Sequence, residues 1–569
     1  MRASARRLLN AAPALRAPLM LLRRVWRVRG AWGAVLADYR STKRETKFFR
    51  KAKLESNGRT LTVFAFDDDS IYGVKQLAFV SQALRLRGWS VQVALRNRAM
   101  VLGAAYFRAF GIDRFLYLND MYLTADERLL CQTSADQLLD QRLSLQLVKG
   151  WQFEGSWIGP QIISTLSRIR FDGMVDFSDS RVHVRLQEML APTLEHVLRA
   201  RKLMQAYPAK LALTIEANYA AFGPLVDMAI AQGVPVIQMI QPWKDDALIF
   251  RRLTASTRRE HPSSVAKESL DAVMLRPWTN VEEQALNQLF ADRYGGRWFL
   301  QARNQQNTRS YTREELTARF SLDRQKPVAV VFSHVLWDAN LFYGDDLFED
   351  YGEWFVETVR AACANTAMNW LLKIHPANVW KRSYENIIRE YTETVLIRRE
   401  IGDLPPHVKL IGSEDDMSTL SLFEHIDYGV TVRGTSGMDL ACFGKHCVTA
   451  GTGRYSGLGF TLDCTNRQQY LDHLANLHKQ RPMTPQEVLR AKWHAYTSFM
   501  LRPWAMKSAR AEFAYGKGQH SLDHNLHLTV SSITEVEACG DLASFADWAE
   551  DDRIDYLAPD AGTPRKATS

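Results

Sequence analysis

The sequence predicts an α/β fold in which two doubly wound domains face a cleft, preceded by a basic helical arm. At 569 residues the chain is too long for one hydrophobic core. A strand–helix–glycine–strand unit at 61–95 has the pattern of a parallel βαβ motif. A second series of buried strands begins at 327, which indicates a second domain of the same class.

In the first half, apolar runs alternate with amphipathic segments. Leu61–Phe66 lacks charged residues, as expected for a strand covered on both faces, and Gly88 ends the helix that follows. Residues 98–205 have a mainly helical pattern, and 241–275, rich in Arg, Lys, Ser and Thr, indicates a loop-bearing insertion or a crossover. The expected elements are strand 61–66, helix 74–84, strand 90–95, strand 211–215, helix 218–232 and strand 234–239.

The second half repeats this alternation. The expected elements are strand 327–332, helix 351–366, strand 370–374, strand 407–411, helix 417–425, strand 428–432, a helix from 436 and strand 447–450. Such Rossmann-like sheets bind ligands beyond the carboxyl ends of their strands, so we expect a site in the interdomain cleft.

Five segments follow from these patterns. They are the basic amphipathic arm 1–55, a first Rossmann-like domain 56–275, a helical linker 276–325, a second Rossmann-like domain 326–510 and an extension 511–569. Five acids near the end predict an acidic, loosely ordered tail beyond about 540: Asp541, Asp547, Glu550, Asp551 and Asp552.

The net charge of +9 is unevenly distributed. Residues 1–53 contain 15 Arg or Lys and two acids, which gives them a local charge of +13 and leaves the remainder at about −4. A protein with a slightly acidic body is not expected to bind nucleic acid, which requires cations on a folded face. No apolar run is long enough to span a bilayer, and the six scattered cysteines indicate a reduced, cytoplasmic-side protein.

The basic arm has an amphipathic pattern. Apolar residues recur at helical spacing from Leu21 to Tyr39, with Arg23, Arg24 and Arg27 on the opposite face. This pattern fits a helix lying in an anionic membrane interface. A helix docked on the protein's own domain, a poorly ordered arm and a cleaved transit peptide remain alternatives.

The most specific motif is the run Arg433-Gly434-Thr435-Ser436-Gly437, which joins a buried strand to a helix. Free backbone N–H groups at a helix start, together with two hydroxyls, can bind a phosphate group. The glycines allow close approach of the backbone. The alternative is an ordinary helix N-cap with Thr or Ser as the capping residue.

A second motif, Lys373-Ile374-His375-Pro376, ends another buried strand and should face the same cleft. Pro376 ends the strand, and Lys373 and His375 can donate hydrogen bonds to phosphate oxygens. His375 can also supply a proton to a leaving phosphate. The alternative is a structural histidine at a strand end.

Together these motifs resemble those of bacterial capsule-polysaccharide biosynthesis glycosyltransferases. The resemblance rests on Lys-x-His-Pro at 373–376, Gly-Thr-Ser-Gly-x-Asp-x-Ala-x-x-Gly-Lys at 434–445 and Tyr-x-x-x-Gly-Phe at 455–460. The family has the GT-B fold and is related to the transferases of 3-deoxy-manno-octulosonic acid. More distantly, the chain is similar to CDP-glycerol polymerases and bacterial sialyltransferases.

The resemblance implies a donor nucleotide in the second domain and an acceptor in the first. It makes Thr435 and Ser436 phosphate ligands and His375 the acid that stabilises the leaving group. Arg433, Gly434, Gly437, Lys373 and Tyr455 are expected to bind substrate as well. Asp439 stands where family members commonly have a Glu suited to ribose hydroxyls. In this fold helix dipoles usually replace a metal, so we expect no metal and no cofactor beyond the nucleotide-sugar co-substrate.

The catalytic base should be a carboxylate or a histidine near the acceptor hydroxyl. Asp67, Asp68 and Asp69 follow the first strand, and we expect Asp69 to be catalytic. Asp338, in the first loop of the second domain, is the other expected catalytic carboxylate, and Glu216 after the strand 211–215 is a further candidate. Asp-rich turns after strands are also common without any catalytic role.

The expected function is a nucleotide-sugar-dependent glycosyltransferase of surface (capsule-type) polysaccharide biosynthesis. A CMP-linked acidic sugar is one candidate donor, and the acceptor is a lipid-linked or growing glycan. We expect a cytoplasmic protein, peripheral on the inner face of the cytoplasmic membrane, with possible capsule biosynthesis partners. One alternative is a phosphotransferase on the same fold, which would transfer a polyol phosphate from a CDP-alcohol. The other is a non-catalytic GT-B scaffold of a capsule assembly or export complex.

Overall fold

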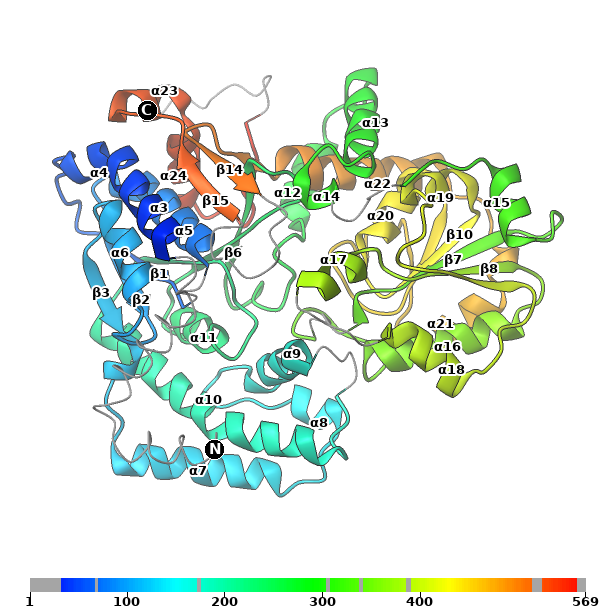
Figure 1. The fold of residues 1–569 in the computed structure, drawn as a ribbon, viewed down its shortest axis with the longest axis horizontal. Coiled ribbons are helices and arrows are strands. Elements are labelled where there is room, and N and C mark those ends of the chain that lie inside the picture. Colours follow the sequence, from blue (N-terminus) through cyan, green and yellow to red (C-terminus); the bar gives the residue numbers. More distant parts are fainter. Residues whose placement is uncertain are drawn as a thin grey trace.

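Two α/β domains stand side by side, each built on its own mainly parallel sheet (Figure 1). The computed structural model describes residues 32–66, 70–170, 175–302, 308–336, 341–384, 390–513 and 524–559. Both sheets carry helices on their faces, which confirms the predicted pair of doubly wound, Rossmann-like domains.

The first domain contains a seven-stranded sheet in the order β13-β6-β5-β4-β1-β2-β3. The strands are β1 (Thr60–Phe64), β2 (Ser90–Leu95), β3 (Arg114–Tyr117), β4 (Leu211–Thr214), β5 (Val236–Ile240), β6 (Ala247–Leu253) and β13 (Trp504–Ala505). Strands β1 to β5 are parallel, whereas β6 pairs antiparallel with β5 and, on its other side, with the edge strand β13. Strand β6 lies within the segment that the sequence predicts as a loop-bearing insertion.

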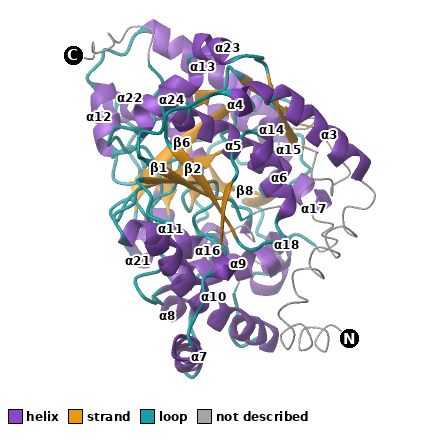
Figure 2. Cartoon of the chain, turned by 90° about the vertical axis from the view of Figure 1, so that its left-hand side faces the viewer, coloured by secondary structure: helices purple, strands orange, loops and turns teal. Residues whose placement is uncertain are grey.

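Helices cover both faces of this sheet (Figure 2). They are α3 (Trp32–Glu45), α4 (Lys47–Lys51), α5 (Ile71–Arg85), α6 (Val101–Ala109), α7 (Ala125–Leu139), α8 (Leu145–Lys149), α9 (Ile158–Arg170), α10 (Ser180–Ala206), α11 (Gly223–Ala231) and α12 (Lys267–Met274). Most of α5 is buried, because it packs between the sheet and the C-terminal segment.

The second domain has a six-stranded, fully parallel sheet in the order β12-β11-β10-β7-β8-β9. Its strands are β7 (Val328–Phe332), β8 (Asn369–Lys373), β9 (Val408–Ile411), β10 (Tyr428–Thr431), β11 (His446–Thr449) and β12 (Leu462–Asp463). Its helices are α13 (Asn280–Tyr294), α14 (Phe299–Ala302), α15 (Arg313–Phe320), α16 (Tyr351–Ala364), α17 (Ala377–Tyr384), α18 (Thr392–Glu400), α19 (Thr419–His425), α20 (Thr435–Cys442), α21 (Arg467–Ala475) and α22 (Pro485–Tyr496). Strands β7 and β8 are buried at every position, as apolar parallel strands require.

After α22 the chain returns to the first domain. Strand β13 pairs with β6, and the segment continues through β14 (Ala509–Phe513), β15 (His524–Leu528), α23 (Ile533–Cys539) and α24 (Asp541–Ala549). Leu542, Phe545 and Trp548 of α24 are buried. The prediction of a loosely ordered tail beyond 540 is therefore wrong for residues 541–559, because apolar side chains at helical spacing anchor them.

The acids of this segment form ion pairs. Arg87 pairs with Asp547 and, at 2.7 Å, with Glu550, and Arg59 reaches Glu550 at 3.0 Å. The acidic composition of the C-terminal segment therefore complements basic residues of the first domain.

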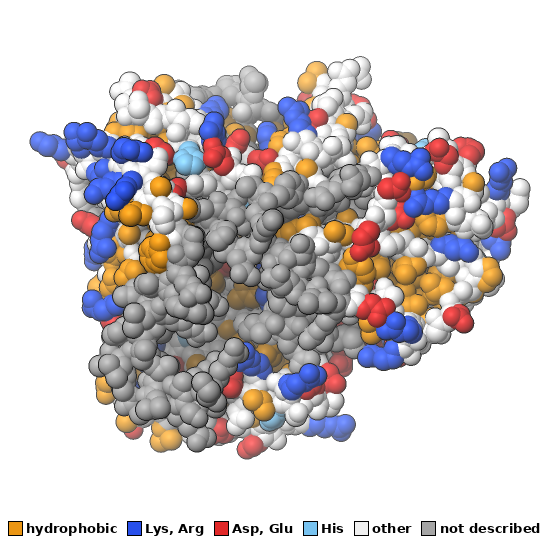
Figure 3. Space-filling model, viewed as in Figure 1, with side chains coloured by type: hydrophobic (Ala, Val, Ile, Leu, Met, Phe, Trp, Pro, Cys, Tyr) orange, Lys and Arg blue, Asp and Glu red, His pale blue; other side chains and the backbone are white. Residues whose placement is uncertain are grey.

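The described part of the basic arm is docked on the first domain. Lys75 of α5 donates a hydrogen bond to Asp38 of α3 at 2.8 Å, and both side chains are buried. Val35 is buried as well, whereas Trp32 and Leu36 are exposed. Lys and Arg side chains gather at the edge formed by α3 and α4 (Figure 3). Among the alternatives, docking holds for 32–51, and residues 1–31 lie outside the described residues.

Every helix in the described ranges is too short or too polar to cross a bilayer.

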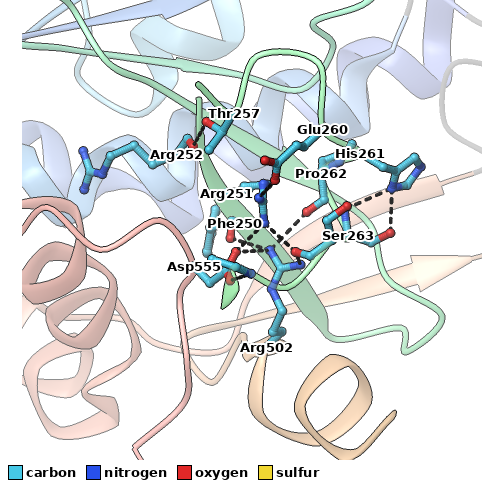
Figure 4. A network of polar contacts seen from close by, with 12 residues as sticks. Phe250, Arg251, Arg252, Thr257, Glu260, His261, Pro262, Ser263, Arg502 and Asp555 are labelled. Carbon is cyan, nitrogen blue, oxygen red and sulfur yellow. Dashed lines mark hydrogen bonds and ion pairs between the residues drawn. The ribbon is translucent and has the colours of Figure 1, made fainter. Parts of the chain in front are cut away.

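A buried polar network fastens the C-terminal segment to β6 (Figure 4). Asp555 accepts hydrogen bonds from Arg251 at 2.8 Å and from the Ala266 backbone at 2.6 Å, and Arg502 lies 3.3 Å away. The three charged side chains are fully buried. Burial lowers the pKa of Arg502 to about 10, and the charge of Asp555 opposes this shift. One carboxylate thus supports two buried guanidinium groups.

Replacing Asp555 with Asn should destabilise the protein by about 3–5 kcal/mol, because the buried Arg502 loses its charged partner and the buried Arg251 loses one of its two. Urea unfolding followed by tryptophan fluorescence measures the change. The control Asp552→Asn replaces an exposed residue and should change stability by less than about 0.5 kcal/mol. Equal effects of the two substitutions would contradict the role of Asp555.

Candidate functional site

Three neighbouring strands of the second sheet end at the candidate site. Strand β7 lies between β10 and β8, so the residues after these strands meet at one edge. His375 follows β8, His334 follows β7, and the glycine turn 433–437 follows β10. The His375 motif and the glycine turn, which we predict to face the same cleft, are therefore separated by a single strand.

His375 is held in a defined orientation. Its backbone N–H donates to Ser333 Oγ at 3.1 Å, and its carbonyl accepts from Ser413 Oγ at 2.8 Å. The backbone N–H of Ala377 donates to Nδ1 of the ring at 3.1 Å. Because Nδ1 accepts this bond, the neutral ring carries its proton on Nε2. The half-buried His375 is thus prepared to donate a hydrogen bond through Nε2.

His334 was not selected from the sequence, although it belongs to the same edge. Its Nε2 accepts a hydrogen bond from the Arg433 backbone at 3.4 Å and lies 3.2 Å from Thr431 Oγ1. Burial lowers the pKa of His334 to about 3, and the proximity of His375 and Arg433 contributes to the shift. His334 is therefore neutral and links the loop after β7 to the turn after β10. Its place one residue beyond Ser333, at a strand end, was the available signal.

The glycine turn leaves the start of α20 without a side-chain cap within the described chain. The N-cap position is Gly434, so Thr435 and Ser436 stand inside the helix. The Gly434 N–H donates to Thr431 Oγ1 at 3.2 Å, and the Gly434 carbonyl accepts from Tyr455 Oη at 2.6 Å. The alternative of a Thr or Ser N-cap is wrong, and the N-terminal end of α20 remains available to an anion.

Gly437 is required by close packing. A Cβ at this position would lie 2.2 Å from Tyr455 Oη, so a larger residue would displace the tyrosine that supports the turn. Tyr455 itself is 1% exposed. Its position beneath the turn is that of a support, and it does not fit the expected direct contact with substrate.

Arg454 adds positive charge beside the turn. Its Nη1 donates to Thr435 Oγ1 at 3.2 Å, and no carboxylate among the described residues forms an ion pair with it. Burial lowers the pKa of the Arg454 guanidinium. A buried cation without a charged partner is costly unless an anion binds beside it. Sequence reasoning missed Arg454, because only the fold brings the loop after β11 to the turn.

Arg433 has a different role from the expected one. Its guanidinium donates to the carbonyls of Tyr343 and, at 3.2 Å, Asp345, and it forms an ion pair with Asp346. Asp346 also accepts a hydrogen bond from Lys149 of the first domain at 3.2 Å. The Arg433 side chain is thus engaged in holding the interdomain loop, and it is directed away from the turn it precedes.

Asp439 is fully buried, which is incompatible with the expected contact to a ribose. Its carboxylate accepts hydrogen bonds from Arg293 at 2.9 Å and from the Tyr294 hydroxyl. Both partners belong to α13, so Asp439 joins this helix to α20. Burial raises the pKa of Asp439, and the charge of Arg293 opposes the shift.

Lys373 ends β8 as predicted, and its side chain is 4% exposed. It makes no hydrogen bond or ion pair within the described ranges. Burial lowers the pKa of Lys373 to about 8, and the charge of Asp415 opposes the shift. The ammonium group therefore stays protonated at neutral pH, although solvation is largely lost.

The two expected catalytic carboxylates, Asp69 and Asp338, lie outside the described residues, as do Asp67 and Asp68. Glu216 follows β4 and is half-buried. The described ranges contain no group of three His, Cys, Asp or Glu side chains that could hold a metal ion. The identity of the base and the expectation of no metal stay predictions.

Comparison with known proteins assigns no family, since no family model and no curated protein matches the chain. The Thermosulfurimonas dismutans KpsC β-Kdo 2,4 transferase shares 15% identity over 52% of this chain and 82% of its own, with a TM-score of 0.30. The UDP-GlcNAc 2-epimerase from Neisseria meningitidis shares 9% identity over 77% of this chain and 97% of its own, with a TM-score of 0.24. Anabaena Alr3699/HepE, in complex with UDP-glucose, shares 11% identity over 77% and 95%, with a TM-score of 0.26. Likenesses this low carry no argument about activity.

Asp439→Asn should lower stability by about 3–5 kcal/mol, because Arg293 would remain buried without a charged partner. Ser436→Ala, which removes a partly exposed hydroxyl, should change stability by less than about 0.5 kcal/mol. Urea unfolding of the two variants measures both effects. Full stability of the Asp439 variant would contradict a stabilising role of the ion pair between Asp439 and Arg293.

Lys373→Met should stabilise the protein at pH 6.5 by about 1–3 kcal/mol, because the buried charge is removed. Between a folded pKa of about 8 and the higher unfolded value, the wild-type folded state loses its buried proton first. The wild type therefore gains stability as pH rises through this window. The advantage of Lys373→Met should decline above pH 8, as measured by urea unfolding from pH 6.5 to 9.5. A constant advantage would contradict a buried, titrating Lys373.

Proposed function

We propose that this protein is a glycosyltransferase that uses a nucleotide-activated sugar. The observation that carries the proposal is the uncapped start of α20, where the Arg454 guanidinium contacts Thr435 and forms no ion pair with a carboxylate of the described residues. Helix N–H groups, two hydroxyls and a guanidinium form a complementary environment for the phosphate of a nucleotide. His375, two strands away, supplies a donor with a fixed tautomer.

The chemistry follows from these groups. The donor phosphate binds at the N–H groups and hydroxyls of Thr435 and Ser436, and Arg454 balances its charge. When the bond between sugar and phosphate breaks, negative charge grows on the phosphate oxygen. The Nε2–H group of His375 stabilises that oxygen by a hydrogen bond or by proton transfer. His334 and Tyr455 keep the turn in place without reacting.

The acceptor hydroxyl must lose a proton, and a carboxylate at the cleft is the proposed base. Asp69, Asp338 and Glu216 are the candidates. The proposed acceptor is a lipid-linked or growing surface polysaccharide of the capsule type. A protein working on such an acceptor would lie on the inner face of the cytoplasmic membrane, and the positive charge of residues 1–53 would attract anionic lipid.

In a panel of CMP-, UDP-, GDP- and CDP-linked donors, the matching donor should raise the unfolding temperature of the purified protein. At a concentration 100 times Kd, the matching donor stabilises by about 2.7 kcal/mol. Ser436→Ala and His375→Ala should lose most of this gain, whereas the surface control Arg481→Gln should keep it. If no nucleotide stabilises the wild type, the transferase proposal fails. Product analysis with a CDP-alcohol separates sugar transfer from polyol-phosphate transfer.

A further inference from the structure

A cavity of about 1090 Å³ lies between the first domain and the loop that follows β11. One wall comes from the segment Arg251–Met274 of the first domain, and the other from Thr452–Leu458 and Arg490 of the second. The size is at the upper end of small-molecule sites, so more than one sugar unit fits. Thr435, Ser436 and His375 are not among the lining residues, so the cavity lies next to the proposed donor-phosphate site and shares Arg454 with it.

Positive charge dominates this cavity. Its lining contains six Lys or Arg residues and three acids: Arg251, Arg259, Lys267, Arg433, Arg454 and Arg490, with Glu260, Glu268 and Asp271. Burial holds the pKa of His261, another lining residue, well below its ordinary value, so this ring adds no charge.

Half of the cations are already paired. Arg251 contacts Glu260 and Asp555 in the network of Figure 4, Lys267 contacts Asp271, and Arg433 contacts Asp346. The other three form no ion pair with any carboxylate in the described ranges: Arg259, Arg454 and Arg490.

The unpaired arginines are held in place by neutral groups. Arg490 donates to the Leu458 carbonyl at 3.0 Å. Arg259 lies 4.9 Å above the Trp157 ring and is half-buried. Arg454 donates to Thr435 Oγ1, so it stands between the cavity and the start of α20. Fixed guanidinium groups without counter-charges bind oxyanions strongly, because their planar N–H donors match carboxylate and phosphate geometry.

We propose that this cavity binds an oxyanion group carried by the glycan substrate, either a phosphate ester or a carboxylate. The inference rests on the proposed function and adds an oxyanion-binding site next to the donor-phosphate site. Arg259 recognises the group from the first domain and Arg490 from the second. Binding there would therefore favour the arrangement in which both walls contact one ligand.

The test uses isothermal titration of the full-length protein with a hexose phosphate, a hexuronate and the uncharged hexose. One or both acidic sugars should bind, and the uncharged hexose should bind at least about tenfold more weakly. Binding of the hexose phosphate indicates a phosphate site, and binding of the hexuronate indicates a carboxylate site. Arg259→Gln and Arg490→Gln, made separately, should each weaken the acidic sugar by about tenfold. The matched control Arg481→Gln removes an exposed arginine that pairs with Glu487 outside the cavity, and it should leave binding unchanged.

Circular dichroism establishes whether each variant is folded. Because the two arginines come from opposite walls, one variant still tests the proposal if the other does not fold. Equal binding of charged and uncharged sugars, or unchanged binding in both folded variants, would overturn the proposal. Ser436→Ala should retain the acidic sugar, because it lies outside the cavity. If acidic sugars bind while no nucleotide stabilises the protein, the cavity proposal holds and the transferase proposal fails.

Discussion

The ion pair between Arg433 and Asp346 connects the candidate site to the interface of the two domains. Arg433 immediately precedes the glycine turn, and its side chain also binds the carbonyls of the loop at 343–345. Asp346 contacts Lys149 of the first domain, and the Gly344 N–H donates to the Arg259 carbonyl at 3.2 Å. The position of the turn and the approach of the first domain therefore depend on the same few contacts.

The buried charged residues of this protein fall into two groups. Some charges join segments far apart in sequence, as Asp38 joins Lys75, Asp439 joins Arg293 and Asp555 joins Arg251. Such pairs cost solvation energy and regain it from their partners. Others, including Lys373 and Arg454, lie near strand ends of the second domain, and no carboxylate in the described part of the chain bonds to them. This second group supports the proposal of anionic substrates, because an anion would supply the missing charge.

Local pattern predicted most of the fold and failed where pairing is remote. The parallel strands were recognised because a run such as Val328–Phe332 is apolar throughout. The local pattern around β6 predicts part of a loop, because its two arginines pair with a carboxylate more than 300 positions away or bond to backbone carbonyls near the C-terminus. The acidic extension has the composition of a loose tail, because its ion pairs with Arg59 and Arg87 cannot be seen in a local window.

The sequence by itself determined where the candidate site lies. Lys373, His375 and the turn from Gly434 to Ser436 stand at strand ends, and strand periodicity and glycine chemistry are local properties of the chain. Only the tertiary structure decided which side chains take part, because orientation depends on packing against distant segments. Packing buried Asp439 against Arg293, engaged Arg433 with the interdomain loop and brought His334 and Arg454 to the turn.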